Sequence, residues 1–556
     1  MAVTNSHAGS AVSAMQVVDA RRPRQKIVVL ALPGMLLAAL CLLPFVNKAY
    51  TIDDPAFLLE ARQILKTPLQ PWSYPICWNG DETCLARAGN LGANDHEGLI
   101  GYLLVPVIAA GGAEWLAHLL QIVLACLAVL EMVRLTLRLK FNRVQAAVAG
   151  MFVVAIPPFL SMASTAMPDI LALALGLTGI ERLAAWKDER RWHQAIAAGV
   201  ALGLAPCARP HEALFLPLAA VWLFDDFKVR KALTQFRQQQ RLWTPILIAT
   251  FVLFAVNFVT RLRDGGLEPK DMLVGPQNIP RNLIAYLHYL AFPIPFVAVW
   301  LIANWRRAKI LVAPQVILIV ISYVMLFRSM TLVRELQLAA VLFGFVALAD
   351  MLYVCLRASD RVGILLSLWV LMPLPAVIYV HLPLKYMLAV LPAIVLILIR
   401  TLSSVSWNRA LFAYGTIILI CTFYSIVLLI ADADFAGYGR RAASELIAPY
   451  VARGEKVWYG GQWGFYWYAQ QAGGRVSKPG ELGPNPGELL AVGLMEGGDV
   501  TLKRFPNREL IDSRSYDSPH GRTMGYGAGL YSNYYGYLPW RWNPNATNTY
   551  QLWRIH

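Results

Sequence analysis

The sequence contains few charged residues for its length, and this scarcity excludes several classes of protein. Only 15% of the 556 residues are Asp, Glu, Lys or Arg, whereas 57% are hydrophobic. A soluble protein carries roughly 25% charged residues, because its surface must be solvated. Low-complexity tracts and internal repeats are also lacking, apart from a polar N-terminal arm, which argues against disordered, fibrous and solenoid proteins. The composition therefore predicts a chain embedded in a lipid bilayer.

The charges that are present are mostly basic. The 49 Lys and Arg residues against 34 Asp and Glu give a net charge of +15, which would also suit a nucleic-acid-binding protein. Here, however, the basic residues form short clusters between apolar runs, as topology signals do under the positive-inside rule. We therefore expect membrane lipids, and no nucleic acid, as partners of this surface.

Apolar runs long enough to cross about 30 Å of hydrocarbon recur along the chain. The first, 27–46, follows a basic cluster and predicts an anchor behind a cytoplasmic arm, 1–26. A cleaved signal peptide is the alternative, although the run is long for one and no A-x-A site follows. The other predicted spans are 113–137, 144–160, 167–185, 194–208, 211–224, 244–260, 283–303, 309–327, 331–353, 362–380, 384–400 and 410–431.

With a cytoplasmic N-terminus, about 13 transmembrane helices place the basic clusters inside. The short apolar run at 99–111 then fits an outer juxtamembrane or re-entrant helix within a first outer loop, 47–112. Residues 432–556 are polar, Gly-rich and aromatic, and predict a small α/β domain outside the membrane. The sequence thus predicts a polytopic α-helical membrane protein, with 27–431 as the transmembrane domain.

The sequence also has few cysteines. Five of the seven fall within or at the ends of predicted spans, where a small apolar filler is the expected role. Cys77 and Cys84 share the first outer loop, and in an oxidising compartment this pair predicts a disulfide. A pair of metal ligands is the alternative, although the spacing matches no standard zinc site.

Polar residues gather at the predicted outer ends of the spans, although charged groups are costly within a membrane. Asp53-Asp54-Pro55 predicts a capped helix start that fixes the Asp53 carboxylate at the membrane surface. Capping alone is the alternative role for Asp54, and for any single residue the alternative is solvation at a loop end. The other polar residues singled out on this side are His96, Glu97, Asp169, Arg209, His211, Arg328 and Lys385.

Five short motifs occur in a fixed order and resemble those of one enzyme family. They are Asp53-Asp54 followed by Ala61-Arg62; His96-Glu97-Gly98-Leu99; Ala166-Met167-Pro168-Asp169; Gly203-Leu204-Ala205 leading to Arg209-Pro210; and Pro383-Leu384-Lys385-Tyr386 before Leu391-Pro392. In this order they resemble the glycosyltransferase C superfamily of polyprenyl-phosphate-sugar enzymes. The resemblance is to the branch with protein O-mannosyltransferase-like and lipid A aminoarabinose transferase-like members. The chain departs from the family's patterns by lacking prolines after His96 and by exchanging Lys and Arg at 209 and 385.

The resemblance implies transfer of a sugar from a polyprenyl-phosphate donor to a glycan, lipid or protein acceptor on the outer face of a bacterial inner membrane. Inversion at the sugar needs one general base, for which Asp53 is the candidate, with Asp54 orienting it or the acceptor. Cations should hold the lipid phosphate as its charge grows. The candidates for this donor site are Arg209 and Lys385, then Arg328 and His96, with His211, Glu97, Asp169 and Tyr386 beside them.

No cofactor is required by this chemistry. A divalent metal bound by the acidic pair with His96 or Glu97 is a weaker alternative. A secondary transporter or lipid flippase is the rival function, but transporters keep ionisable groups near the midplane and show internal repeats. A non-catalytic scaffold would not explain the acidic pair. The aromatic residues of 458–468 are expected either at the lipid headgroups or, less favoured, against sugar rings.

Overall fold

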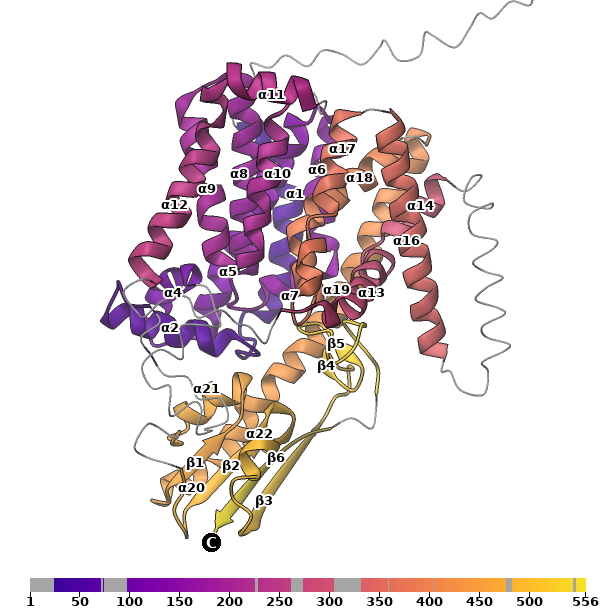
Figure 1. Cartoon of the computed structure of the whole chain (residues 1–556). Coiled ribbons are helices and arrows are strands. Elements are labelled where there is room, and N and C mark those ends of the chain that lie inside the picture. The colour runs from indigo at the N-terminus through magenta and orange to yellow at the C-terminus, as the bar shows by residue number, and fades with distance from the viewer. Residues whose placement is uncertain are drawn as a thin grey trace, which may run out of the picture.

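A computed structural model describes residues 25–71, 74, 98–225, 229–261, 274–304, 332–358, 360–403, 405–476, 483–543 and 547–556. Figure 1 shows a large bundle of helices with a small sheet at one end. We call this end of the bundle the sheet end. The opposite end carries α11 (Val229–Gln238) and is called the α11 end.

The helices of the bundle form two groups along the chain. The first comprises α1 (Gln25–Leu42), α5 (Glu114–Arg138), α6 (Arg143–Ala155), α7 (Pro157–Ala163), α8 (Asp169–Glu189), α9 (Trp192–Ala208), α10 (Phe215–Leu223) and α12 (Thr244–Arg261). The second comprises α13 (Ile279–Ala291), α14 (Phe296–Ala303), α16 (Leu332–Ala358), α17 (Arg361–Val370), α18 (Leu391–Leu402) and α19 (Trp407–Leu446). Together they confirm a polytopic helical membrane protein.

The predicted number of 13 spans is not confirmed. Among the described residues, 7 helices are long and apolar enough to cross a membrane, or up to 9 if each bent pair is one span. The run predicted at 144–160 is bent by 64° where Pro157 begins α7, and the run at 283–303 is bent by 53° between α13 and α14. Proline disfavours helical geometry in the residue before it, which explains the first break. The span predicted at 309–327 lies outside the described residues.

Two shorter helices lie at the sheet end beside the bundle (Figure 1). They are α2 (Asp54–Lys66) and α4 (Leu99–Ala109), and they pack against each other. The 11 residues of α4 are too few to cross the hydrocarbon, and Gly111 and Gly112 follow it with positive φ. The short run near residue 99 is therefore a helix too short to span the membrane, as predicted.

The C-terminal region contains a four-stranded sheet with the order β1-β2-β6-β3. Its strands are β1 (Val457–Gly460), β2 (Leu489–Gly493), β3 (Arg508–Asp517) and β6 (Thr547–Ile555). β1 and β2 are parallel and joined through α21 (Trp463–Gln471), whereas β6 is antiparallel to both of its neighbours. This sheet is the predicted small α/β region. α19 reaches it without a break, so the predicted boundary at 432 falls inside a helix.

The aromatic residues around α21 are buried, so neither predicted role describes them. Six of them are at most 5% exposed: Trp458, Tyr459, Phe465, Tyr466, Trp467 and Tyr468. α21 packs against α19 and α2, which explains why an aromatic sequence is needed there. The Trp467 ring, for example, meets Tyr50 edge-on with 5.8 Å between centroids. These rings join the C-terminal region to the membrane bundle.

Candidate functional site

The acidic pair at the start of α2 has two different environments. Asp53 occupies the N-cap position, but its side chain makes no capping bond. Its Oδ2 atom instead lies 3.4 Å from the Nζ atom of Lys385. The capping role predicted for Asp53 is therefore wrong. Asp53 is a partly exposed carboxylate beside a cation, and its side chain is 25% exposed.

Asp54 is fully buried and fixes the backbone around it. Its Oδ2 accepts a hydrogen bond from the Thr51 N–H at 2.9 Å, and its Oδ1 accepts one from the Ala166 N–H at 2.8 Å. Burial raises the pKa of Asp54 to about 7, while the charge of Lys48 and these two N–H groups limit the rise. Asp54 thereby ties the first loop to the segment before α8, and leaves Asp53 as the accessible carboxylate.

A buried ion pair joins the start of α8 to the end of α9. The Nη2 atom of Arg209 lies 2.5 Å from Oδ2 of Asp169, and the guanidinium carbon lies 5.8 Å from the centroid of the Phe57 ring. Burial acts to lower the pKa of Arg209, but Asp169, Tyr386 and Asp53 raise it by more, so the guanidinium stays charged. Its Nε is buried without a hydrogen-bond partner among the described residues.

The turn before α18 supplies the second cation. Lys385 lies at the start of the 3-10 helix η7 (Leu384–Val390), which leads into α18. Together they form the candidate span Leu384–Leu402, which is the most buried of the 7 candidate spans among the described residues. The next residue, Tyr386, places its ring 4.5 Å from that of His211 and 6.0 Å from that of His381. Burial, then the charge of Lys385, lowers the pKa of His381 to about 4, so this imidazole is neutral at pH 7.

The structure therefore brings together many of the residues singled out in the sequence. Four segments meet at the sheet end: the start of α2, the start of α8, the turn between α9 and α10, and the turn before α18. They carry Asp53, Asp54, Asp169, Arg209, His211, Lys385 and Tyr386. His96, Glu97, Arg328, Cys77 and Cys84 lie outside the described residues. Within the described part, no three His, Cys, Asp or Glu side chains are grouped as metal ligands.

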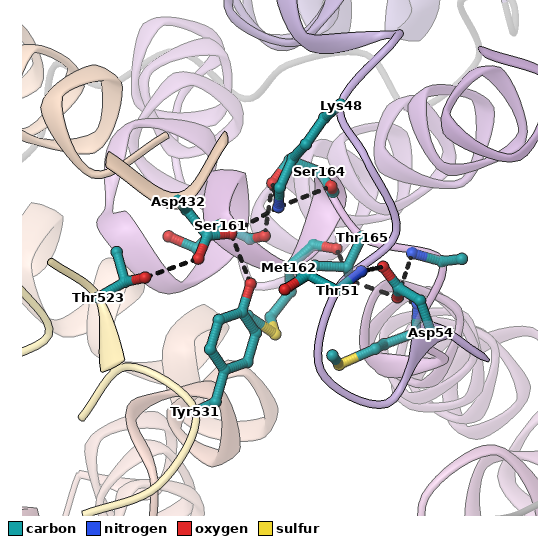
Figure 2. Close-up of polar contacts among 12 residues, drawn as sticks. Lys48, Thr51, Asp54, Ser161, Met162, Ser164, Thr165, Asp432, Thr523 and Tyr531 are labelled. Atoms are coloured by element: carbon teal, nitrogen blue, oxygen red, sulfur yellow. Dashed lines mark hydrogen bonds and ion pairs between the residues drawn. The ribbon is translucent and has the colours of Figure 1, made fainter. Parts of the chain in front are cut away.

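Sequence reasoning missed a second lysine–aspartate pair at the same end. Figure 2 shows Lys48, which follows α1, and Asp432, in the middle of α19, with their neighbours. Lys48 Nζ lies 2.5 Å from Asp432 Oδ2 and also donates to the Ser164 carbonyl at 3.1 Å. Asp432 accepts further hydrogen bonds from Thr523 at 2.8 Å and Tyr531 at 2.6 Å. The signal available in the sequence was a lysine and an aspartate that each lie next to an apolar run.

Comparison with known families gives a result for the first half of the bundle. Residues 85–263 match the family model described as dolichyl-phosphate-mannose-protein mannosyltransferase. This segment holds Asp169, Arg209 and His211 of the site and covers about a third of the chain. The resemblance read from the motifs is confirmed there. No curated protein sequence matches the chain.

Solved structures with similar folds include three membrane enzymes. ArnT from Cupriavidus metallidurans bound to undecaprenyl phosphate is 12% identical over 95% of this chain and 98% of that chain, with a TM-score of 0.49. The archaeal oligosaccharyltransferase AglB from Archaeoglobus fulgidus is 12% identical over 84% and 69%, with a TM-score of 0.45. The arabinosyltransferase EmbB from Mycobacterium smegmatis is 13% identical over 76% and 42%, with a TM-score of 0.36.

Proposed function

We propose that this protein is a membrane glycosyltransferase that moves a sugar from a polyprenyl-phosphate donor to an acceptor at the sheet end. The observation that carries the proposal is the position of Asp53, a partly exposed carboxylate 3.4 Å from Lys385 and within the field of buried, charged Arg209. A polyprenyl-phosphate donor is inferred because the matched family is named for dolichyl-phosphate-mannose.

Asp53 is the general base in this proposal. It takes the proton of the acceptor hydroxyl or amine while that atom bonds to the anomeric carbon, and the bond from this carbon to the phosphate oxygen breaks. The bonding electrons leave with the lipid phosphate, and attack from the face opposite to it inverts the anomeric centre. Asp54 supports the base indirectly, because its carboxylate accepts hydrogen bonds from two backbone N–H groups and so fixes the turn that carries Asp53.

Arg209 and Lys385 are the cations for the leaving phosphate. Negative charge grows on the phosphate as the bond breaks, so fixed cations stabilise the transition state more than the ground state. Asp169 holds the Arg209 guanidinium in place, while the buried Nε of Arg209 has no partner among the described residues. A donor phosphate also offers Lys385 a second anion, which loosens its contact with Asp53 and frees the base.

The surroundings of the enzyme form part of the proposal. We place it in a bacterial inner membrane with the N-terminus in the cytoplasm and the sheet end outside, as the positions of the basic clusters favour. The acceptor is a glycan, a lipid or a protein. The transferred sugar is a hexose or a pentose.

The test is an Asp53→Asn variant of the full chain reconstituted in vesicles. Labelled undecaprenyl-phosphate mannose and undecaprenyl-phosphate aminoarabinose serve as donors, and membranes from cells lacking the protein supply the acceptors. We expect turnover to fall roughly 10²–10⁴-fold while donor binding stays within a few-fold. Asp434→Asn, which changes an aspartate paired with His520 elsewhere at this end, is the matched control.

Two outcomes would contradict the proposal. Unchanged turnover in Asp53→Asn would exclude Asp53 as the base. Movement of the labelled lipid between leaflets without release of polyprenyl phosphate, in the unaltered protein, would instead identify a flippase.

A further inference from the structure

A loop of the C-terminal region is hydrogen-bonded to the turn before Lys385 and, through Asp432, is linked to the segment before Asp53. We call residues 523–537 the tyrosine loop; it includes the short strands β4 (Met524–Gly525) and β5 (Ala528–Gly529). Figure 1 shows β4 and β5 directly beneath the bundle, near α13 and α19. The backbone at Gly536 packs closely against that at Gly527, since a Cβ atom at Gly536 would lie 2.0 Å from the Gly527 carbonyl oxygen. Glycine is therefore required there.

Thr523 and Tyr531 of the tyrosine loop hold the segment before Asp53 through Asp432. Thr523 and Tyr531 donate to the two carboxylate oxygens of Asp432, which in turn binds Lys48 (Figure 2). Lys48 precedes Asp53 by five residues, and its own carbonyl is 3.0 Å from His118 Nε2. All these polar groups are buried, so their hydrogen bonds are costly to break.

Asn533 of the tyrosine loop holds the turn before Lys385. Asn533 accepts a hydrogen bond from the Leu382 N–H at 3.1 Å and donates one to the Asn282 side chain at 2.9 Å. Asn282 itself donates to the carbonyls of Val377 and Tyr379, at 2.9 and 2.7 Å. The turn that leads into Lys385 is thus bonded to α13 and to the tyrosine loop at once.

We propose that the tyrosine loop sets the separation of Asp53 and Lys385, with Tyr531 and Asn533 as positioning residues. The inference rests on the proposed function. Tyr531 donates to Asp432, which binds Lys48, and Asn533 accepts from the Leu382 N–H, so each acts through the segment that it holds. A misplacement of about 1 Å at a reacting centre costs roughly a hundredfold in rate, so small shifts in either segment should be visible.

The experiment compares Tyr531→Phe and Asn533→Ala with Tyr535→Phe in the reconstituted full chain. Tyr535 belongs to the same loop and its side chain is 40% exposed, so its variant loses the same hydroxyl group without a buried partner. We expect kcat to fall roughly tenfold to a hundredfold in the first two variants, with donor KM little changed. Asn533→Asp keeps the oxygen that accepts the Leu382 N–H and should recover part of kcat.

The pH profile supplies a readout that a purely structural role would not move. A longer distance to Lys385 weakens the positive field that favours the ionised form of Asp53. The acidic limb of the profile should then move to higher pH in Tyr531→Phe and Asn533→Ala only. The proposal is overturned if kcat and this limb match those of Tyr535→Phe.

Amide hydrogen exchange separates failure of this inference from failure of the proposed function. Exchange should rise at 47–54 in Tyr531→Phe and at Leu382 in Asn533→Ala, whatever reaction the protein catalyses. Faster exchange with unchanged kcat means that the contacts are structural and the inference is wrong. If the unaltered protein transfers no sugar, the proposed function fails and this positioning role fails with it. Hydrogen exchange that is unchanged in both variants would instead refute the contacts themselves.

A second, independent observation comes from the α11 end. A cleft of about 680 Å³ lies there between the end of α8, the start of α9, and the end of α11 with the residues after it, and no carboxylate lines it. Its lining includes Arg190, Arg237 and Arg241 together with Trp186 and Trp192. The nearest carboxylates in sequence, Asp188 and Glu189, pair with Arg138 and Arg191 instead.

We infer that this cleft binds the phosphate of an anionic membrane lipid. Guanidinium groups suit phosphate because they donate two parallel hydrogen bonds. The tryptophan rings are 5.7 Å apart; Trp186 is buried and donates to the Leu242 carbonyl, whereas Trp192 is 58% exposed. An exposed tryptophan beside cations at the end of a membrane bundle is typical of the headgroup level.

Native mass spectrometry of the full chain from vesicles of phosphatidylcholine and phosphatidylglycerol tests this site. Joint substitution of Arg190, Arg237 and Arg241 by Gln should remove a retained phosphatidylglycerol. The same change at Arg143, Arg357 and Arg409, exposed arginines outside the cleft at this end, should not. Equal loss in both triple variants would refute a specific site, and displacement of the lipid by millimolar inorganic phosphate would show a free-anion site instead.

Discussion

Two lysine–aspartate pairs lie at the sheet end, and their surroundings give them different properties. The Lys48–Asp432 pair is 2.5 Å long, with side chains 0% and 1% exposed, and both ends make further hydrogen bonds. The Lys385–Asp53 pair is 3.4 Å long, and its aspartate is 25% exposed. The same two chemical groups therefore form a structural contact where both are buried and fully hydrogen-bonded, and an accessible carboxylate, the base of the proposed reaction, where the pair is longer and partly exposed.

Removal of Lys48 should have the largest effect on stability. Lys48→Met leaves the Asp432 carboxylate buried without its cation, which typically costs about 3–5 kcal/mol. Lys385→Met should cost about 1 kcal/mol or less, because water reaches Asp53. Thermal unfolding of the two variants in the same detergent measures the difference. Equal losses would show that burial does not distinguish the two pairs.

A double variant, Lys48→Met with Asp432→Leu, is the control for this interpretation. Replacing both members of a buried pair by apolar side chains is often close to neutral. Most of the lost stability should therefore return, although Thr523 and Tyr531 lose their acceptor. A double variant as unstable as Lys48→Met would mean that packing, and not the unpaired charge, is responsible.

The Arg209–Asp169 pair sharpens the comparison, because it is buried and still belongs to the site. Arg209→Lys keeps the charge near Asp169 but removes the planar array of donors. We expect a loss of about 1.5–3 kcal/mol in donor binding, which is roughly tenfold to a hundredfold in affinity. Binding of undecaprenyl phosphate to the reconstituted protein measures this, with the exposed Arg440→Lys as control. Unchanged affinity would remove Arg209 from the phosphate site.

The sequence predicted which residues gather at the candidate site better than it predicted the buried polar contacts that hold their segments in place. Asp53, Arg209 and Lys385 were predictable because each is a charged residue at the end of an apolar run, on the same predicted side. Lys48 and Asp432 are separated by 384 residues, and no local pattern specifies which of the charged residues at this end should pair. The contact of Asn282 with Asn533 is equally non-local.

The number of spans was harder to predict than the class of fold. Hydropathy identifies apolar segments, but a proline inside one can divide it, as at Pro157. A helix can also continue beyond its apolar part, as α19 does through Asp432, because the polar residues there find partners in the tyrosine loop.

The smallest expected effect concerns Glu496, a buried carboxylate that, unlike the two aspartates compared above, has no cationic partner among the described residues. It accepts hydrogen bonds from the Tyr550 hydroxyl and the Phe465 N–H, and burial raises its pKa to about 7. Because the folded state binds this proton more tightly than the unfolded state, the stabilisation is complete below pH 4.5 and is lost as the pH rises through 7. Between pH 6 and 7 we expect a loss of at most about 1.4 kcal/mol. Because Asp54 titrates in the same range, Glu496→Gln should reduce the pH dependence of the free energy of unfolding by this amount, and the exposed Glu509→Gln should leave it unchanged. A pH dependence as large in Glu496→Gln as in the unaltered protein would show that Glu496 is not one of its sources.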